Sequence, residues 1–228
     1  MIQRFVAILF MVFGFIPTAQ AEGPVVVELF TSQSCSSCPP ADKVLAELES
    51  QDNIIALSCH VTYWNHLHWE DTLSQNFCSE RQRDYALLKG LRGPYTPQVV
   101  VNGGGETVGS RKRAVQNLVK NAPAIDNIAI KPDVGVLDIA LPDLQDGEYQ
   151  LTLFTYGNEH TQAIPSGENR GRTVTYTNPV TARVRLGAWN GDTQILEFDT
   201  TGYQPEGGYV VIAQDARGII HAAGRLKL

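Results

Sequence analysis

The sequence predicts an α/β fold for the first half of the chain and an antiparallel β fold for the second half. A β-branched apolar run over residues 25–31 leads into two cysteines, and amphipathic helical spacing follows over residues 41–50. A second apolar run without helical period, residues 53–63, then predicts a buried parallel strand. After Pro123, short alternating runs separated by turn residues predict an antiparallel sandwich.

Residues 1–21 have the features of a secretory signal peptide. Arg4 supplies the positive n-region, residues 5–16 form a short apolar segment, and Ala19-Gln20-Ala21 is a small-x-small cleavage site. The apolar segment is short for a membrane span, and no later segment reaches the required length. We therefore expect a periplasmic or secreted protein that begins at Glu22 and is not inserted in the membrane after signal removal.

Composition limits the classes of partner. The chain of 228 residues has a formal net charge of −6, 18% charged residues and 43% hydrophobic residues. Its one basic cluster, Arg111-Lys112-Arg113, opens a short predicted helix and is typical of a solvated face, so we expect no nucleic-acid partner. The length allows one large or two small domains, and the change of pattern near Pro123 favours two, over residues 22–124 and 125–228.

The two cysteines after the first strand, Cys35 and Cys38, are the main candidate site. A pair at i and i+3 on the first turn of a helix shares one face and can close a small disulfide ring, and the helix terminus stabilises a thiolate. Because the thiolate is the species that attacks disulfides, the pair is a candidate redox centre. A static structural disulfide and half of a zinc site are the competing interpretations.

The sequence allows two N-cap positions for the helix that follows the cysteines. Pro39 and Pro40 are tolerated only near a helix start. Either Cys35 is the N-cap, which would activate its thiol more strongly, or the regular helix begins near Pro39 and Cys38 is the N-cap.

The middle of the first half combines a buried strand with an irregular segment. His60, near the end of the second strand, could accept a proton close to the cysteines, or could be a core histidine bonded to neighbouring backbone. Residues 64–90 are predicted to be an insertion that forms a lid beside the cysteines. Its helix is predicted over Ser79 to Leu88, with Ser79 as N-cap, Arg81 and Arg83 paired with Glu80 and Asp84, and Tyr85 and Leu88 inward.

The end of the first half predicts a hairpin and a helix. Residues 98–102 and 106–108 are strands joined by Gly103-Gly104-Gly105, and Ser110 caps a helix over residues 111–121. Pro97 stands before the first of these strands, where proline is admissible as a first residue or in a cis turn. In the second half, strands are predicted near residues 134–139, 148–156, 172–176, 182–186, 193–198, 209–213 and 219–223.

The order of these elements resembles the thioredoxin fold, in which a cis-proline before the third core strand lies against a Cys-x-x-Cys pair. Thr96-Pro97 stands at the matching place. The segments 29–42, 60–64, 81–82, 95–103 and 167–172 are similar to those of a bacterial secreted family called domain of unknown function twelve-twenty-three. The resemblance implies a thioredoxin-like domain followed by a β-sandwich-like domain, with Cys35, Cys38 and Pro97 as the matching redox positions.

If the resemblance extends to function, the chemistry is thiol–disulfide exchange with a protein or a small thiol or disulfide partner, without a cofactor. Cys35, nearer the helix start and more exposed, would form the mixed disulfide, and Cys38 would resolve it. Ser36 and Ser37 supply no cation to Cys35. One alternative is a non-enzymatic binding module with a locked disulfide. Another is a copper-handling protein, since His66 and His68 could form a metal site with Cys78 and thioredoxin-like proteins that handle copper use a cysteine pair plus a histidine.

Two further features leave alternatives open. Either Cys59 and Cys78 bridge each other in an oxidising compartment, or one of them is a small buried apolar side chain. The run Gly167-Glu168-Asn169-Arg170-Gly171-Arg172 is either a recognition loop for a carboxylate or a loop that bridges the two domains.

Overall fold

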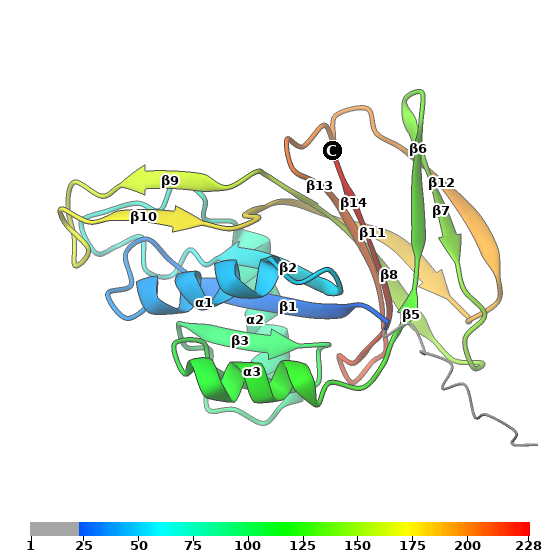
Figure 1. The fold of residues 1–228 in the computed structure, drawn as a ribbon, viewed down its shortest axis with the longest axis horizontal. Coiled ribbons are helices and arrows are strands. Elements are labelled where there is room, and N and C mark those ends of the chain that lie inside the picture. Colours follow the sequence, from blue (N-terminus) through cyan, green and yellow to red (C-terminus); the bar gives the residue numbers. More distant parts are fainter. Residues whose placement is uncertain (1–22) are drawn as a thin grey trace, which may run out of the picture.

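The protein has a mixed α/β fold with its strands arranged in several sheets (Figure 1). The structure is a computed structural model that describes residues 23–228, so the predicted signal peptide lies outside the described residues. The helices of residues 23–228 are α1 (Pro39–Glu49), α2 (Asn76–Leu88) and α3 (Lys112–Lys120). Among them, no helix is long and apolar enough to cross a membrane.

The strands fall into two groups along the chain. Those before residue 110 are β1 (Val25–Thr31), β2 (Ile54–His60), β3 (Gln98–Val101) and β4 (Gly105–Val108). Those after residue 125 are β5 (Asp126–Asn127), β6 (Ala129–Asp133), β7 (Val136–Leu141), β8 (Tyr149–Tyr156), β9 (His160–Ala163), β10 (Thr173–Tyr176), β11 (Val180–Trp189), β12 (Gln194–Asp199), β13 (Gly208–Gln214) and β14 (Ile220–Lys227).

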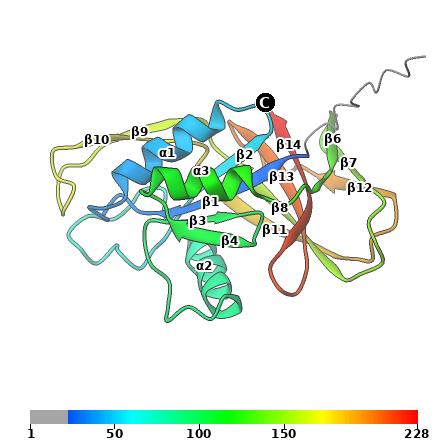
Figure 2. The ribbon, with the colours of Figure 1, turned by 60° about the horizontal axis from the view of Figure 1, so that its bottom comes forward.

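The first half is built around a four-stranded sheet with the order β2-β1-β3-β4. β1 and β2 are parallel, as their connection through α1 requires, whereas β3 and β4 run antiparallel. Val27 and Leu29 of β1 pack with α1 and α3, and Phe30 packs with Cys78 and Tyr85 of α2. The side chains of β1 therefore alternate between the two helical layers, with α1 and α3 on one face and α2 on the other (Figure 2).

The second half is organised around a five-stranded sheet, β11-β8-β13-β14-β5. The three-stranded sheet β12-β7-β6 packs against one face of it through a cluster that includes Ile139, Leu153 and Val211. On the opposite face, Phe154 and Ile212 share a buried cluster with Val26, Ile55 and Leu57 of the first half. Since burial of one such side chain stabilises by about 1.5–3 kcal/mol, this shared cluster joins the two halves firmly.

A two-stranded hairpin, β9-β10, extends from the second half and runs beside α1 (Figure 1). Its buried side chains, Ile164, Val174 and Tyr176, form a separate cluster against Trp69 and Leu73 of the first half. The loop between its strands therefore reaches the end of the four-stranded sheet that carries the cysteine pair.

The prediction for α2 was wrong at its start and on its inner face. The helix begins at Asn76 with Gln75 as N-cap, because the hydroxyl of Ser79 bonds instead to the backbone N–H of Thr62 at 2.9 Å. Arg81 is buried and pairs with Glu28 of β1 rather than with Glu80 or Asp84. Leu88 is 50% exposed, and so does not belong to the inner face.

The starts of α3 and β7 differ from the predicted ones by one and two residues. α3 begins at Lys112 with Arg111 as N-cap, so Ser110 is not the cap. β7 begins at Val136, because Gly135 turns the chain with a φ of 75° and leaves Val134 exposed. β5, β6 and β9 were not predicted, since they are short or lack an alternating apolar pattern.

Candidate functional site

The Cys35–Cys38 pair forms a disulfide at the junction of β1 and α1, with a Cα–Cα distance of 5.4 Å. The regular helix begins at Pro39, and Cys38 is its N-cap, which is the second of the two starts that the sequence allows. The backbone N–H groups of Ala41 and Asp42 both donate to the carbonyl of Cys38. Cys35 therefore lies before the helix, and the helix terminus acts on it less directly than it would in the other geometry.

The cysteine turn is more buried than the sequence predicted. Cys35 is 3% exposed and Cys38 is fully buried, so Cys35 is the more exposed of the two, but only slightly. Ser36 and Ser37 between them are exposed. The turn thus presents its serines to solvent, while both sulfurs are largely covered by neighbouring segments.

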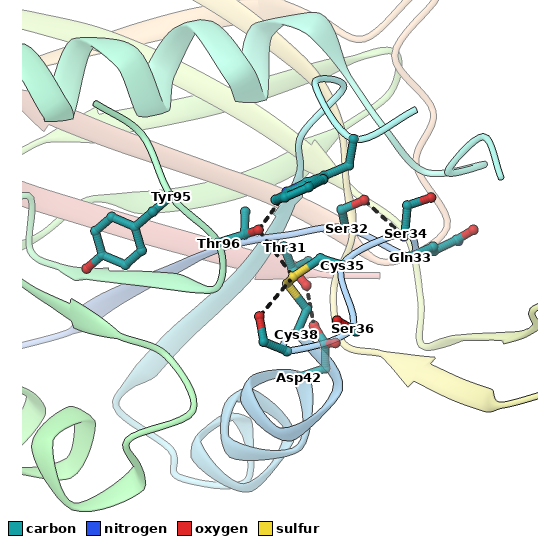
Figure 3. The surroundings of a disulfide bond; sticks show 12 residues. Thr31, Ser32, Gln33, Ser34, Cys35, Ser36, Cys38, Asp42, Tyr95 and Thr96 are labelled. Atoms are coloured by element: carbon teal, nitrogen blue, oxygen red, sulfur yellow. Dashed lines mark hydrogen bonds between the residues drawn. A yellow bond between two sulfur atoms is a disulfide. The ribbon is translucent and has the colours of Figure 1, made fainter. Parts of the chain in front are cut away.

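Two hydroxyl groups contact the sulfur of Cys35. Thr96 Oγ1 lies 3.2 Å from Cys35 Sγ and Ser37 Oγ lies 3.3 Å from it (Figure 3). A disulfide sulfur carries no hydrogen, so both hydroxyls donate. Thr96 also accepts a 2.7 Å hydrogen bond from the indole N–H of Trp64, and its peptide bond to the buried Pro97 is cis.

The loop of the β9-β10 hairpin covers the other side of the cysteine turn. The side-chain amide of Asn169, which is 1% exposed, donates to the carbonyls of Gln33 and Cys35 at 2.8 and 2.9 Å. Arg172 donates to Asn169 Oδ1 at 2.9 Å and to the carbonyl of Ser36 at 3.4 Å. Residues 167–172 therefore bridge the second half of the chain to the candidate site.

A buried carboxyl group lies in α1 one helical turn after Cys38. Asp42 is 2% exposed, and its Oδ1 accepts a 2.9 Å hydrogen bond from the hydroxyl of Thr31 (Figure 3). Burial raises the pKa of Asp42 to about 7, against the lowering effects of His60 and of the Thr31 hydrogen bond. A residue four positions after Cys38 lies on the same helix face, so this carboxyl is well placed to exchange a proton with the buried cysteine.

His60 belongs to the same buried cluster. Its Nδ1 lies 2.8 Å from Asp71 Oδ2, and its ring meets that of Tyr176 edge to face at 4.7 Å. Burial acts to raise the pKa of Asp71, but His60 and hydrogen bonds from the N–H groups of Gln33 and Leu73 outweigh it and lower that pKa. Asp71 therefore holds His60 in place as an ionised partner.

Two polar atoms of this cluster have no hydrogen-bond partner in the structure, Asp42 Oδ2 and His60 Nε2. Both are buried, and His60 and Asp42 are close enough for the charge of one to act on the pKa of the other. A buried polar atom without a partner is costly and often marks a functional group. Asp42, whose pKa is raised to about 7, can take up or release a proton near neutral pH.

The second pair of cysteines forms the disulfide Cys59–Cys78, which joins β2 to α2. Its surroundings are apolar, with Phe30, Val61 and Val100 in the same buried cluster. The described residues place no hydroxyl group against its sulfurs like those on Cys35, and such a position is typical of a structural bridge.

The sequence-predicted residues divide clearly by their place in the structure. Cys35, Cys38, Thr96 and Pro97 come together, and His60 lies in the cluster with Asp71. His66 and His68 are exposed, and residues 23–228 contain no group of three or more His, Cys, Asp or Glu side chains suited to a metal ion. Within the predicted lid, residues 64–90, Trp64 contacts the site, whereas α2 covers the far face of the sheet.

Sequence reasoning gave no individual role to Asp42, Trp64 or Asn169, although it considered residues 167–172 as a loop that bridges the two domains. The spacing of four between Cys38 and Asp42 is a local signal that could have identified the carboxyl. No comparable signal exists for Asn169, which lies 134 residues from Cys35, because its contact depends on how the two halves pack.

Comparisons with known proteins agree with this architecture. The X-ray crystal structure of protein AGR_C_4864 from Agrobacterium tumefaciens is similar, with 28% identity, a TM-score of 0.80 and coverage of 92% of this chain and 96% of that chain. HBP35 of Porphyromonas gingivalis shares the fold at 16% identity, with a TM-score of 0.56 and coverage of 91% of this chain and 76% of its own.

No curated protein matches the chain. A family model, described as protein of unknown function (DUF1223), matches residues 26–214. The chain therefore belongs to the DUF1223 family, to which the sequence resemblance had pointed.

Proposed function

We propose that this chain is an exported thiol–disulfide oxidoreductase in which Cys35 and Cys38 are the redox pair. The observation that carries the proposal is the placement of the Cys35–Cys38 disulfide between a hydroxyl donor on Cys35 and the buried carboxyl of Asp42. Two disulfides in one chain are compatible with an oxidising compartment, which agrees with the predicted signal peptide.

The arrangement of the first half supports a thioredoxin-like domain. The sheet order β2-β1-β3-β4, the cysteine pair between β1 and α1, and Pro97 directly before β3 all match that architecture. We assign residues 22–124 to this domain and residues 125–228 to a β-sandwich-like domain formed by the packed five-stranded and three-stranded sheets.

The proposed exchange moves two electrons and balances without a cofactor. In the reducing direction, the Cys35 thiolate attacks one sulfur of a partner disulfide, forming a mixed disulfide and releasing the other sulfur as a thiolate. The Cys38 thiol then loses its proton and attacks Cys35 Sγ, which forms the Cys35–Cys38 bond and releases the second partner sulfur. The partner gains two electrons and the cysteine pair loses them; the oxidising direction is the reverse.

Asp42 is the proposed proton acceptor for Cys38. Its pKa of about 7 allows it to take up and release a proton near neutral pH. His60, held by Asp71, is close enough to Asp42 to act on its pKa and favours its ionised form. His60 thus acts on the exchange through Asp42.

A second candidate function is favoured by the burial of Cys35. An attacking sulfur that is only 3% exposed suits a structural disulfide, and the chain would then be a non-enzymatic binding module. The β9-β10 loop, which holds the cysteine turn in place, would be part of the binding surface.

The reduction potential of the Cys35–Cys38 pair separates the two functions. The mature protein is equilibrated in glutathione redox buffers, thiols are trapped by alkylation, and mass spectrometry identifies which cysteines are labelled. A potential of roughly −120 to −270 mV, the range of known exchange proteins, supports the oxidoreductase. A value below about −300 mV marks a structural bridge and favours the binding module.

A further inference from the structure

We propose that Trp64 is a positioning residue that orients the hydroxyl of Thr96 toward the sulfur of Cys35, so that Thr96 stabilises the Cys35 thiolate. This inference rests on the proposed function, since only a reducible pair forms that thiolate in the course of exchange. Trp64 acts through Thr96 and does not itself hydrogen-bond to the sulfur.

The hydroxyl of Thr96 accepts a hydrogen bond from Trp64 and donates one to Cys35. A threonine hydroxyl has one hydrogen and two lone pairs, and an indole N–H only donates. The 2.7 Å bond from Trp64 Nε1 therefore occupies a lone pair of Thr96 Oγ1. The hydroxyl hydrogen remains free to donate to Cys35 Sγ, 3.2 Å away.

Trp64 is held in place by its neighbours. Its ring stacks with that of His66 at 6.4 Å and lies 5.9 Å from the ring of Tyr63. It also packs against the buried cluster that contains the Cys59–Cys78 disulfide. A ring fixed on these sides keeps its N–H directed at Thr96, so the orientation of the hydroxyl is set before Cys35 reacts.

The second hydroxyl on Cys35 differs in this respect. Ser37 is exposed, and no tryptophan or other donor fixes its hydroxyl among the hydrogen bonds of the described residues. Water can replace a freely rotating exposed donor at little cost. The half-buried Thr96 is harder for water to replace, and hydrogen bonds to a charged group are about twice as strong as neutral ones. Thr96 is therefore the donor that stabilises the Cys35 thiolate more than the neutral thiol.

The test uses Cys38→Ser protein, in which Cys35 is a free thiol whether or not the disulfide is readily reduced. The pKa of Cys35 is measured from the ultraviolet absorbance of its thiolate during a pH titration. Tyr63, whose pKa burial raises to about 12, stays neutral through most of this range. Asp42, whose pKa is raised to about 7, titrates within it but adds little ultraviolet signal. The charged or titratable side chains around the cysteine turn, Asp42, His60, Asp71, Glu168 and Arg172, are the same in every variant.

Trp64→Phe and Thr96→Val are each expected to raise the pKa of Cys35 by about one unit, the effect of losing one charge-assisted hydrogen bond. At a pH below the pKa, the reaction with a thiol reagent is expected to slow by only about threefold, because nucleophilicity rises as the thiolate fraction falls. Thr96→Ser keeps the hydroxyl and is expected to restore the original pKa. Trp189→Phe, a replacement of the same kind in the distant second-half cluster, is the control and should change nothing.

Two results would overturn the proposal. If Thr96→Val raises the pKa but Trp64→Phe does not, Trp64 has no orienting role. If neither changes it, Thr96 does not stabilise the thiolate. Urea unfolding of each variant excludes misfolding, and Cys38→Ala gives a second background if Cys38→Ser fails to fold. A very low reduction potential of the wild-type pair would instead reject the oxidoreductase function and leave this result standing.

Discussion

The two disulfides of this protein lie in different surroundings. Cys35–Cys38 closes a loop with a sequence separation of 3, and hydroxyl groups contact its sulfur. Cys59–Cys78 spans 19 residues and lies among apolar side chains. The difference supports the proposal that Cys35–Cys38 is the redox pair and Cys59–Cys78 a structural bridge.

The comparison also shows that the two bridges are connected. The cluster around Cys59–Cys78 supports Trp64, and Trp64 donates to Thr96, which contacts Cys35. The cluster around Cys59–Cys78 therefore helps to hold the surroundings of Cys35–Cys38. The following predictions test this division of roles in order of decreasing expected effect.

Replacement of Cys35 by Ser is expected to abolish thiol–disulfide exchange, because the group that forms the mixed disulfide is lost. The measurement is reduction of a dithiol-sensitive reporter disulfide by reduced protein. The matched variant Cys59→Ala/Cys78→Ala is expected to retain exchange. If Cys59→Ala/Cys78→Ala loses exchange and Cys35→Ser retains it, the roles assigned to the two pairs are reversed.

Replacement of Asp42 by Asn is expected to change how stability depends on pH. The pKa of Asp42 is raised from 3.8 to about 7 in the folded protein, so the fold binds a proton more tightly than the unfolded chain. This stability is fully present below pH 3.8 and is lost as pH rises through 7, by up to roughly 4 kcal/mol.

Urea unfolding between pH 4 and 9, a range chosen from these two pKa values, tests that prediction. The difference in unfolding free energy between Asp42→Asn and wild type should grow in favour of the variant as pH rises. A difference that is independent of pH would show that Asp42 is not protonated in the folded protein near neutral pH.

Removal of the Cys59–Cys78 bridge in the Cys59→Ala/Cys78→Ala variant is expected to lower the free energy of unfolding by about 3 kcal/mol, from the chain entropy of a loop of this length. The same estimate for Cys35→Ala/Cys38→Ala is about 2 kcal/mol, because its loop is much shorter. Urea unfolding of both double variants, with wild type as reference, provides the comparison. Equal losses would mean that local packing outweighs loop length.

Replacement of Asn169 by Ala is expected to speed reduction of Cys35–Cys38 by a small thiol about fivefold, the factor for one net hydrogen bond of about 1 kcal/mol. The reason is that its side-chain amide fastens the β9-β10 loop to the carbonyls of Gln33 and Cys35. Reduction of Cys59–Cys78 should not change. Asn190→Ala, in an exposed turn of the second half, is the matched control, and an equal rate in Asn169→Ala and wild type would show that the loop does not limit access.

Much of the fold followed from local patterns. The β-branched run of β1, the amphipathic spacing of α1 and the glycine turn between β3 and β4 are signals within ten or so residues, and each predicted its element. α2 was placed less well, because Ser79 has the composition of an N-cap but its hydroxyl bonds to Thr62 across the fold. A local propensity was there overridden by a tertiary contact.

The sequence alone determined the cysteine pair, its place between a strand and a helix, the proline before β3 and the change to β structure after Pro123, since these depend on neighbouring residues. Only the tertiary structure decided the environment of the pair: the burial of Cys35 beneath a loop that contains Asn169, the contact of Trp64 with Thr96, and the burial of Asp42 with His60. The physical reason is that exposure, hydrogen-bond geometry and pKa depend on which distant segments exclude water from a group, and the packing of the two halves determines those segments.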